Sequence, residues 1–166
     1  MTYVLSSRSL NSLDGVHPSL VAIVKRAITI TKQDFIVIEG VRSKEQCMIN
    51  YGKGRTVAQV VAKGIPASFA NPNHAKVTWL KNPFNSKHCK QVDGYGHAVD
   101  ICPYPVDWSD LTKFDAIAQA MFTAEKQLIN EGVIPKITNL RWGADWNKNG
   151  KYRERGESDS PHFEIL

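Results

Sequence analysis

The sequence predicts a single α+β domain, and three observations support this prediction. The chain has 166 residues, the size of one ordinary domain. Hydrophobic residues make up 42% and charged residues 22%, a composition that is typical of globular proteins and excludes disordered, collagen-like and coiled-coil chains. Segments with helical spacing are interspersed with several short β-branched segments, which indicates helices combined with non-sequential strands.

The first half of the chain predicts a helix, a strand and a second helix. A helix is expected from near Pro18, a favoured first helical residue, because apolar residues follow at helical spacing: Leu20, Ile23, Val24, Ala27 and Ile30. Residues 35–39 are β-branched and closed by Gly40, which predicts a strand. The polar stretch from Ser43 to about Tyr51 is expected to be helical.

The second half begins with a long irregular segment. Residues 64–96 are rich in Pro, Gly, Asn and Lys, with a short strand expected at 76–80, and loops of this length are often functional. Further strands are predicted at 97–102, 137–142 and 162–165. The longest helix is predicted over 109–130, capped by Ser109 and followed by Gly132.

The charge balance favours anionic partners. The formal net charge is +5 and the isoelectric point is about 9.1, so nucleic acid, anionic lipid and an acidic cell-wall polymer are all compatible. The basic residues are scattered, without an Arg/Lys tract, and no nucleic-acid partner is expected. No apolar stretch approaches the roughly 20 residues that span a bilayer, so no membrane insertion is expected either.

The cysteines predict neither a disulfide scaffold nor a zinc knuckle. There are three of them, Cys47, Cys89 and Cys102, and none forms a C-x-x-C pair. Cys47 and Cys102 are expected to be small core residues. Because the N-terminus also shows no secretory signal, synthesis in a reducing cytoplasm is expected.

Two clusters of residues offer the ligands of a catalytic metal. One contains His88 and, downstream, Asp100; the other runs from Asp159 to His162. A catalytic zinc needs three His or carboxylate ligands, an open position for water, and a nearby carboxylate to accept a proton. Alternation along a strand places Asp100 and His97 on opposite faces, so His88 and His162 are the residues expected to meet Asp100. Asp159 is then placed to act as the base.

The residues alone leave a plainer interpretation open. A lone histidine is more often a surface or core residue than a ligand, Asp100 could bond a loop backbone, and Asp159 could cap a turn. The composition and the spacing do not decide between these interpretations.

Several motifs in order resemble one family of zinc metallopeptidases. Ser86-x-His88, Gly96-x-Ala98-x-Asp100 and Asp159-x-x-His162 resemble the pattern of enzymes that cleave peptidoglycan stem peptides: VanY-like D-Ala-D-Ala carboxypeptidases and the L-alanyl-D-glutamate endopeptidases of phage endolysins. The signalling domain of Sonic hedgehog is a distant relative of the same fold. Three segments are similar to the endolysin branch in particular: residues 38–43 with Gln46, 96–100 with Pro103-Tyr104, and 140–146. The resemblance covers about residues 18–166 and implies a small antiparallel sheet with flanking helices.

The resemblance also implies roles for individual residues. His88, Asp100 and His162 match the zinc ligands, Asp159 the general base, and Arg42 the arginine that stabilises the substrate carbonyl and oxyanion. For Arg42, a structural ion pair is the alternative.

One spacing departs from the family pattern. His88 lies 12 residues before Asp100, where the family has seven, which we interpret as a five-residue insertion. The position seven residues before Asp100 holds Asp93, so a site of Asp93, Asp100 and His162 is an alternative. His97 and Cys89 are weaker candidates for the first ligand.

A calcium site is a second metal prediction. Asp145, Asn147, Asn149 and Gly150 match the opening of an EF-hand loop, although its twelfth position is Gly156 rather than a bidentate glutamate. Glu154 and Glu157 lie close by, and an ordinary turn is the alternative. Trp142, Trp146 and Tyr104 could line a peptide groove or belong to the core.

The sequence therefore predicts a zinc-dependent phage endolysin that cleaves the L-Ala–D-Glu bond of bacterial peptidoglycan. A D,D-carboxypeptidase or dipeptidase that releases D-Ala is one alternative, and a non-catalytic zinc-containing binding module is another. Residues 1–166 are expected to form one monomeric catalytic domain without a separate wall-binding domain. The protein is expected in the host cytoplasm until a holin-type release brings it to the wall.

Overall fold

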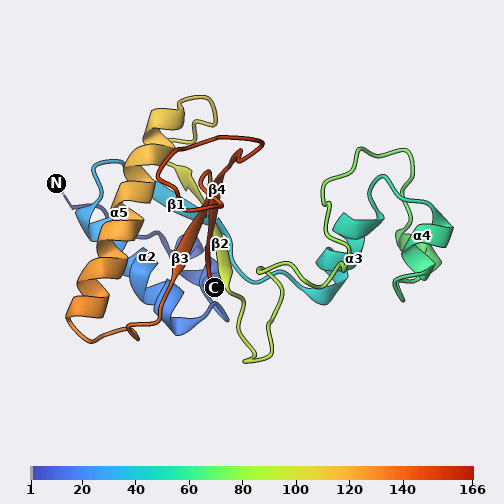
Figure 1. Ribbon diagram of the computed structural model, residues 1–166, viewed down its shortest axis with the longest axis horizontal. Helices are drawn as coiled ribbons and strands as arrows, with labels where there is room; N and C mark the ends of the chain where they lie inside the picture. Colours follow the sequence, from blue (N-terminus) through green and yellow to red (C-terminus); the bar gives the residue numbers. More distant parts are fainter. Residues whose placement is uncertain (1) are drawn as a thin grey trace.

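The computed structural model describes residues 2–166 and shows the predicted α+β fold (Figure 1). Its four-stranded antiparallel sheet has the order β1-β2-β4-β3, with β1 Phe35–Glu39, β2 Ala98–Pro103, β3 Leu140–Gly143 and β4 Asp159–Ile165. The helices are α1 Ser7–Ser12, α2 Pro18–Ile30, α3 Lys44–Gly52, α4 Val57–Val61, the 3-10 helix η1 Ala67–Phe69, and α5 Leu111–Asn130. No helix within residues 2–166 is long and apolar enough to cross a membrane.

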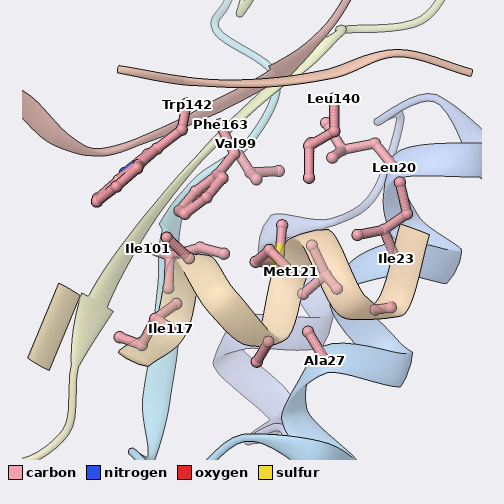
Figure 2. Close-up of a cluster of buried hydrophobic side chains, with 14 of the residues drawn as sticks. Leu20, Ile23, Ala27, Val99, Ile101, Ile117, Met121, Leu140, Trp142 and Phe163 are labelled. Carbon is pink, nitrogen blue, oxygen red and sulfur yellow. The ribbon is translucent and has the colours of Figure 1, made fainter. Parts of the chain in front are cut away.

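The main core lies between one face of the sheet and helices α2 and α5 (Figure 2). Each element contributes fully or almost fully buried side chains: Leu20, Ile23 and Ala27 from α2, Ile117 and Met121 from α5, Val99 and Ile101 from β2, Leu140 and Trp142 from β3, and Phe163 from β4. Since side chains alternate along a strand, the residues between these positions face away from the helices. Asp100, His162 and Glu164 therefore lie on the helix-free face.

Residues 44–85 form a projection that we call the side lobe (Figure 1). It contains α3, α4 and η1 and stands to one side of the sheet. Its own small core consists of Tyr51, Val60 and Ile65, with Met48, Phe69 and Phe84 packed around them. The lobe is inserted between β1 and β2, and the chain segments that enter and leave it run side by side, with a bridge between Arg42 and Cys89.

A disulfide between Cys47 and Cys89 corrects the prediction for these cysteines. It links α3 to the segment that returns to the sheet, so Cys47 is not a plain core residue and Cys89 is not free to act as a metal ligand. Sequence spacing could not reveal the pair, because the two residues lie 42 positions apart and meet only when the lobe folds back. Cys102 is free and buried, as expected.

Most predicted elements are confirmed, with local corrections. The segment 76–80 forms no strand, because it lies in the side lobe away from the sheet edges. Asp110, not Ser109, caps α5 by accepting a hydrogen bond from the Thr112 backbone N–H at 3.1 Å. The third strand begins at residue 140 rather than 137, since Ile137 is 89% exposed in the preceding turn. Helices α1 and α4 were not predicted.

One residue of α2 that was predicted to belong to the core, Ile30, lies outside the buried face of the helix. Ile28 is buried, while Ile30 is 37% exposed. Ile28 stands four residues after Val24 and therefore on the same side of the helix, whereas Ile30 is rotated toward solvent.

Candidate metal centre

Three predicted ligands converge on the helix-free face of the sheet. Asp100 on β2 and His162 on β4 are direct cross-strand partners, so the register of the sheet places their side chains together. His88 comes from the segment that returns from the side lobe. This segment is held in place because the Arg42 backbone N–H donates to the His88 carbonyl at 2.8 Å and the His97 N–H donates to the Lys87 carbonyl at 2.7 Å.

The three candidate ligand atoms form a nearly equilateral triangle. His88 Nε2 lies 3.2 Å from Asp100 Oδ1 and 3.2 Å from His162 Nδ1, and His162 Nδ1 lies 3.3 Å from Asp100 Oδ1. Atoms bound tetrahedrally to zinc at 2.0–2.1 Å are about 3.3 Å apart. The triangle therefore has the dimensions of three corners of a zinc tetrahedron.

Hydrogen bonds on the far side of each imidazole fix which nitrogen faces the triangle. His88 Nδ1 donates to the Gly40 carbonyl at 2.8 Å, which leaves the lone pair of Nε2 pointing at Asp100. His162 Nε2 donates to Glu164 Oε1 at 2.8 Å, which leaves Nδ1 as the nitrogen that faces the triangle. Glu164 is itself buried and accepts from Arg141 Nη2 at 2.8 Å. Such partners orient metal-binding histidines in known metalloproteins.

The electrostatics of the triangle favour a positive charge. Asp100 Oδ1 is buried, and although both imidazoles lie within 3.3 Å of it, neither contact has the geometry of a hydrogen bond. Burial would raise the pKa of Asp100, but the two histidines outweigh it and hold this pKa well below its usual range. Burial would likewise lower the pKa of His162, yet Asp100 and Glu164 raise it to about 9. A proton on His162 supplies the positive charge that a metal ion would otherwise provide.

Asp159 lies at the edge of the triangle. Its Oδ2 is 4.0 Å from His162 Nδ1, and its side chain is 53% exposed. Partial burial raises the pKa of Asp159, the negative charge of Asp100 raises it further, and His162 opposes both effects. Asp159 is thus a carboxylate beside the ligands that keeps access to solvent.

Arg42 faces the same cavity and also forms the structural ion pair that the sequence left open. Its Nε donates to Glu39 Oε1 at 2.8 Å and its Nη1 to Ser86 Oγ at 3.3 Å. The cavity measures about 370 Å³, with Arg42, Asp159 and the triangle on one side. The side lobe supplies the other wall, through residues of α3 and of the segment 77–80.

The predicted calcium loop closes around Asp145. The Asp145 carboxylate accepts from the backbone N–H groups of Asn149 and Gly150 at 3.0 Å each, and Asn147 Oδ1 accepts from the Asn149 N–H at 3.0 Å. Glu157 Oε1 accepts from the Asn147 N–H at 3.2 Å, while its Oε2 is buried without a hydrogen-bond partner within residues 2–166. Glu157 follows directly after Gly156, the twelfth position of the loop. It is therefore the carboxylate best placed to replace the glutamate that an EF-hand loop has there.

The alternative first ligands lie in a different cluster. Asp93 Oδ2 is 2.7 Å from His97 Nε2 and 3.9 Å from His17 Nε2. His17 Nδ1 accepts from the Ser19 backbone N–H at 3.1 Å, so the proton of the neutral ring is on Nε2 and no lone pair points toward Asp93. This cluster anchors the extra loop residues to α2, away from Asp100.

Trp142 and Trp146 take different positions. Trp142 is fully buried and donates to the Ser160 carbonyl at 2.6 Å, so it belongs to the core. Trp146 lies against His162, with ring centroids 5.3 Å apart. Tyr104 is 52% exposed.

Comparison with known proteins identifies the family. Residues 1–166 match the family described as phage L-alanyl-D-glutamate peptidase. The chain belongs to this family. Within the phage L-alanyl-D-glutamate peptidases, it is 31% identical over 172 residues to the L-alanyl-D-glutamate peptidase of Escherichia phage T5, with the whole of both chains covered. Its fold is similar to that of the L-Ala D-Glu endopeptidase ChiX of Serratia marcescens, with a TM-score of 0.55 and 24% identity over 98% of this chain and 90% of that one.

For this phage L-alanyl-D-glutamate peptidase, sequence reasoning missed Glu164 as the partner of His162. The signal was present: the two residues stand two apart on one strand and must therefore face the same side. Ser86 accepts a hydrogen bond from Arg42, a role that its place in the Ser86-x-His88 motif does not predict. The contribution of α3 to the cavity wall had no sequence signal, because it depends on how the side lobe folds back.

Proposed function

We propose that this L-alanyl-D-glutamate peptidase is a zinc enzyme that works as a phage endolysin, with His88, Asp100 and His162 as the metal ligands. The observation that carries the proposal is the triangle of candidate ligand atoms, 3.2–3.3 Å on each edge, with one ring nitrogen of each histidine facing it. Two histidines and one carboxylate with an open fourth position are a typical catalytic zinc set. Zinc bound there would lower the pKa of a water to roughly 7 and polarise the scissile carbonyl.

The residues around the triangle supply the remaining chemistry. Asp159 accepts a proton from the attacking water and later passes it to the leaving amine, since it is the exposed carboxylate beside the ligands. The raised pKa of Asp159 makes its carboxylate a better proton acceptor, which suits both steps. Arg42 stabilises the negative oxygen of the tetrahedral intermediate; Glu39 and Ser86 fix its orientation, and its Nη2 keeps free donors among residues 2–166.

The substrate that we propose is bacterial peptidoglycan. The net charge of +5 favours binding to an anionic cell envelope. Residues 1–166 would act as one monomeric catalytic domain, made in the host cytoplasm and able to reach the wall after a holin-type release. Light scattering of the purified protein tests the monomer.

Digestion of purified muropeptides tests the reaction. Mass spectrometry should find new peptides that begin with D-Glu. Release of free D-Ala would instead support a D,D-carboxypeptidase or dipeptidase, and intact muropeptides would support a binding module without catalysis.

Zinc analysis tests the ligands. One zinc per chain is expected in the wild type and in Asp93→Ala, and both zinc and activity should be lost in His88→Ala. Zinc retained by His88→Ala would move the first ligand elsewhere.

A calcium site at Asp145, Asn147 and Asn149 is a second proposal. The buried and unpartnered Oε2 of Glu157 favours it, because a cation would satisfy this oxygen. The loop leads directly to Asp159, so calcium would set the position of the base. Calcium should raise the thermal unfolding midpoint of the wild type but not of Asp145→Asn.

A further inference from the structure

The proposed substrate carries a negative charge close to the scissile bond. In an L-Ala–D-Glu bond the amine of the glutamate is acylated by alanine, and at most one of its two carboxyl groups continues the chain. At least one carboxylate therefore remains on the leaving residue, within a few bonds of the scissile nitrogen. A site that pairs this carboxylate gains both affinity and discrimination.

Two basic side chains line the cavity at the triangle, Arg42 and Lys53. Arg42 is already paired with Glu39. Lys53 is half-buried and, in the part of the chain that the structure describes, has no carboxylate within 4.0 Å. The cavity thus contains a cation whose charge the protein leaves unneutralised.

Lys53 does not stand alone on this wall. It follows directly after α3, and Asn50 stands three residues earlier, so both side chains lie on one face of the helix end and both line the cavity. The Asn50 side-chain oxygen accepts from Gln46 Nε2 at 2.9 Å, which leaves the N–H donors of its amide free. An ammonium group and an amide side by side are a suitable pair of donors for a carboxylate.

The end of α3 is held firmly in place. Arg55 is buried, and it donates to the Tyr51 carbonyl at 2.7 Å and to the Thr78 carbonyl at 2.8 Å, which joins α3 to the segment 77–80. The disulfide from Cys47 to Cys89 ties the same helix to the residue after His88. The cavity wall that carries Lys53 is therefore anchored to the segment that carries His88.

We propose that Lys53, assisted by Asn50, binds the free carboxylate of the D-glutamyl residue on the leaving side of the scissile bond and so determines specificity for it. This inference rests on the proposed peptidase function. In this proposal, the cavity wall formed by the side lobe recognises the leaving residue, and the wall formed by Arg42, Asp159 and the triangle carries out the chemistry.

A matched pair of substrates tests the proposal. One is a stem peptide with an L-Ala–D-Glu bond, and the other is the same peptide with the free carboxylate of D-Glu converted to a carboxamide. The wild type should cleave the carboxylate form with a kcat/KM at least about tenfold higher, as expected for one charge-assisted contact. In Lys53→Met this preference should fall to below about twofold, mainly through a higher KM for the carboxylate peptide, and Lys53→Arg should restore most of it.

Lys63→Met is the control, because Lys63 is an exposed lysine of the same lobe that does not line the cavity. It should keep the wild-type preference. The proposal is overturned if the wild type does not prefer the carboxylate peptide, a result that needs no variant. It is also overturned if Lys53→Met lowers cleavage of both peptides equally. If the wild type cleaves neither peptide nor muropeptides, the proposed function fails instead.

Discussion

Zinc and a proton should compete for His162, and the size of this competition follows from the structure. In the metal-free protein, the nearby carboxylates of Asp100 and Glu164 outweigh burial and raise the pKa of His162 to about 9. At pH 7 the ring is therefore protonated in all but about 1% of molecules, and zinc must displace that proton from Nδ1. The affinity for zinc should rise about tenfold per pH unit between 7 and 9, or about 2.7 kcal/mol in total, and then level off.

Two measurements check this competition. Titration against a chelator of known pH dependence gives the affinity, and calorimetry in two buffers of different ionisation enthalpy at pH 7.5 should report about one proton released from this site. A zinc affinity that does not change between pH 7 and pH 9, or binding without proton release, would refute the reasoning.

Glu164→Gln sharpens the test. The variant keeps the size of the side chain but removes one of the three carboxylates that raise the pKa of His162, so the affinity should level off at a lower pH. Glu125→Gln is the control, because Glu125 accepts a hydrogen bond from the Leu140 backbone N–H and forms no contact with His162. Its pH profile should match that of the wild type.

Three further outcomes are expected. Asp159→Asn should lower kcat by about 10²–10⁴-fold while the zinc content stays at one per chain, and lost zinc would contradict its role as a base. In the metal-free protein the raised pKa of His162 contributes stability that is fully present below about pH 6.5 and is lost as the pH rises through about 9, so the free energy of unfolding in urea should fall over that window. Under denaturing, non-reducing conditions a thiol reagent should modify Cys102 alone, and reduction of the bond between Cys47 and Cys89 should cost about 4 kcal/mol for a separation of 42 residues. Three reactive thiols before reduction would contradict the disulfide.

The elements with strong local signals were predictable. The spacing from Pro18 and the β-branched run at 35–39 give α2 and β1 with the bounds that the structure has. The two-residue alternation of strands also predicted that Asp100 and His97 lie on opposite faces of the sheet. The motifs then predicted that His88 and His162 lie on the same face as Asp100.

Features that depend on tertiary packing could not be predicted from the sequence. The segment 76–80 has the composition of a strand but finds no partner in the side lobe. The disulfide of Cys47 depends on α3 meeting the returning chain, and the position of Lys53 in the cavity wall depends on the same packing. Local sequence does not encode such contacts, because each forms between segments far apart along the chain.

The way the side lobe is attached has an evolutionary consequence. Its two ends leave the sheet as neighbouring segments, and β1 and β2 keep their own pairing whatever is inserted between them. Residues of the side lobe other than Cys47, Asn50 and Lys53 can therefore diverge between relatives, while Asp100 on β2 and His162 on β4 retain their register. Selection by different bacterial hosts could act on these variable residues and leave the hydrolytic machinery intact.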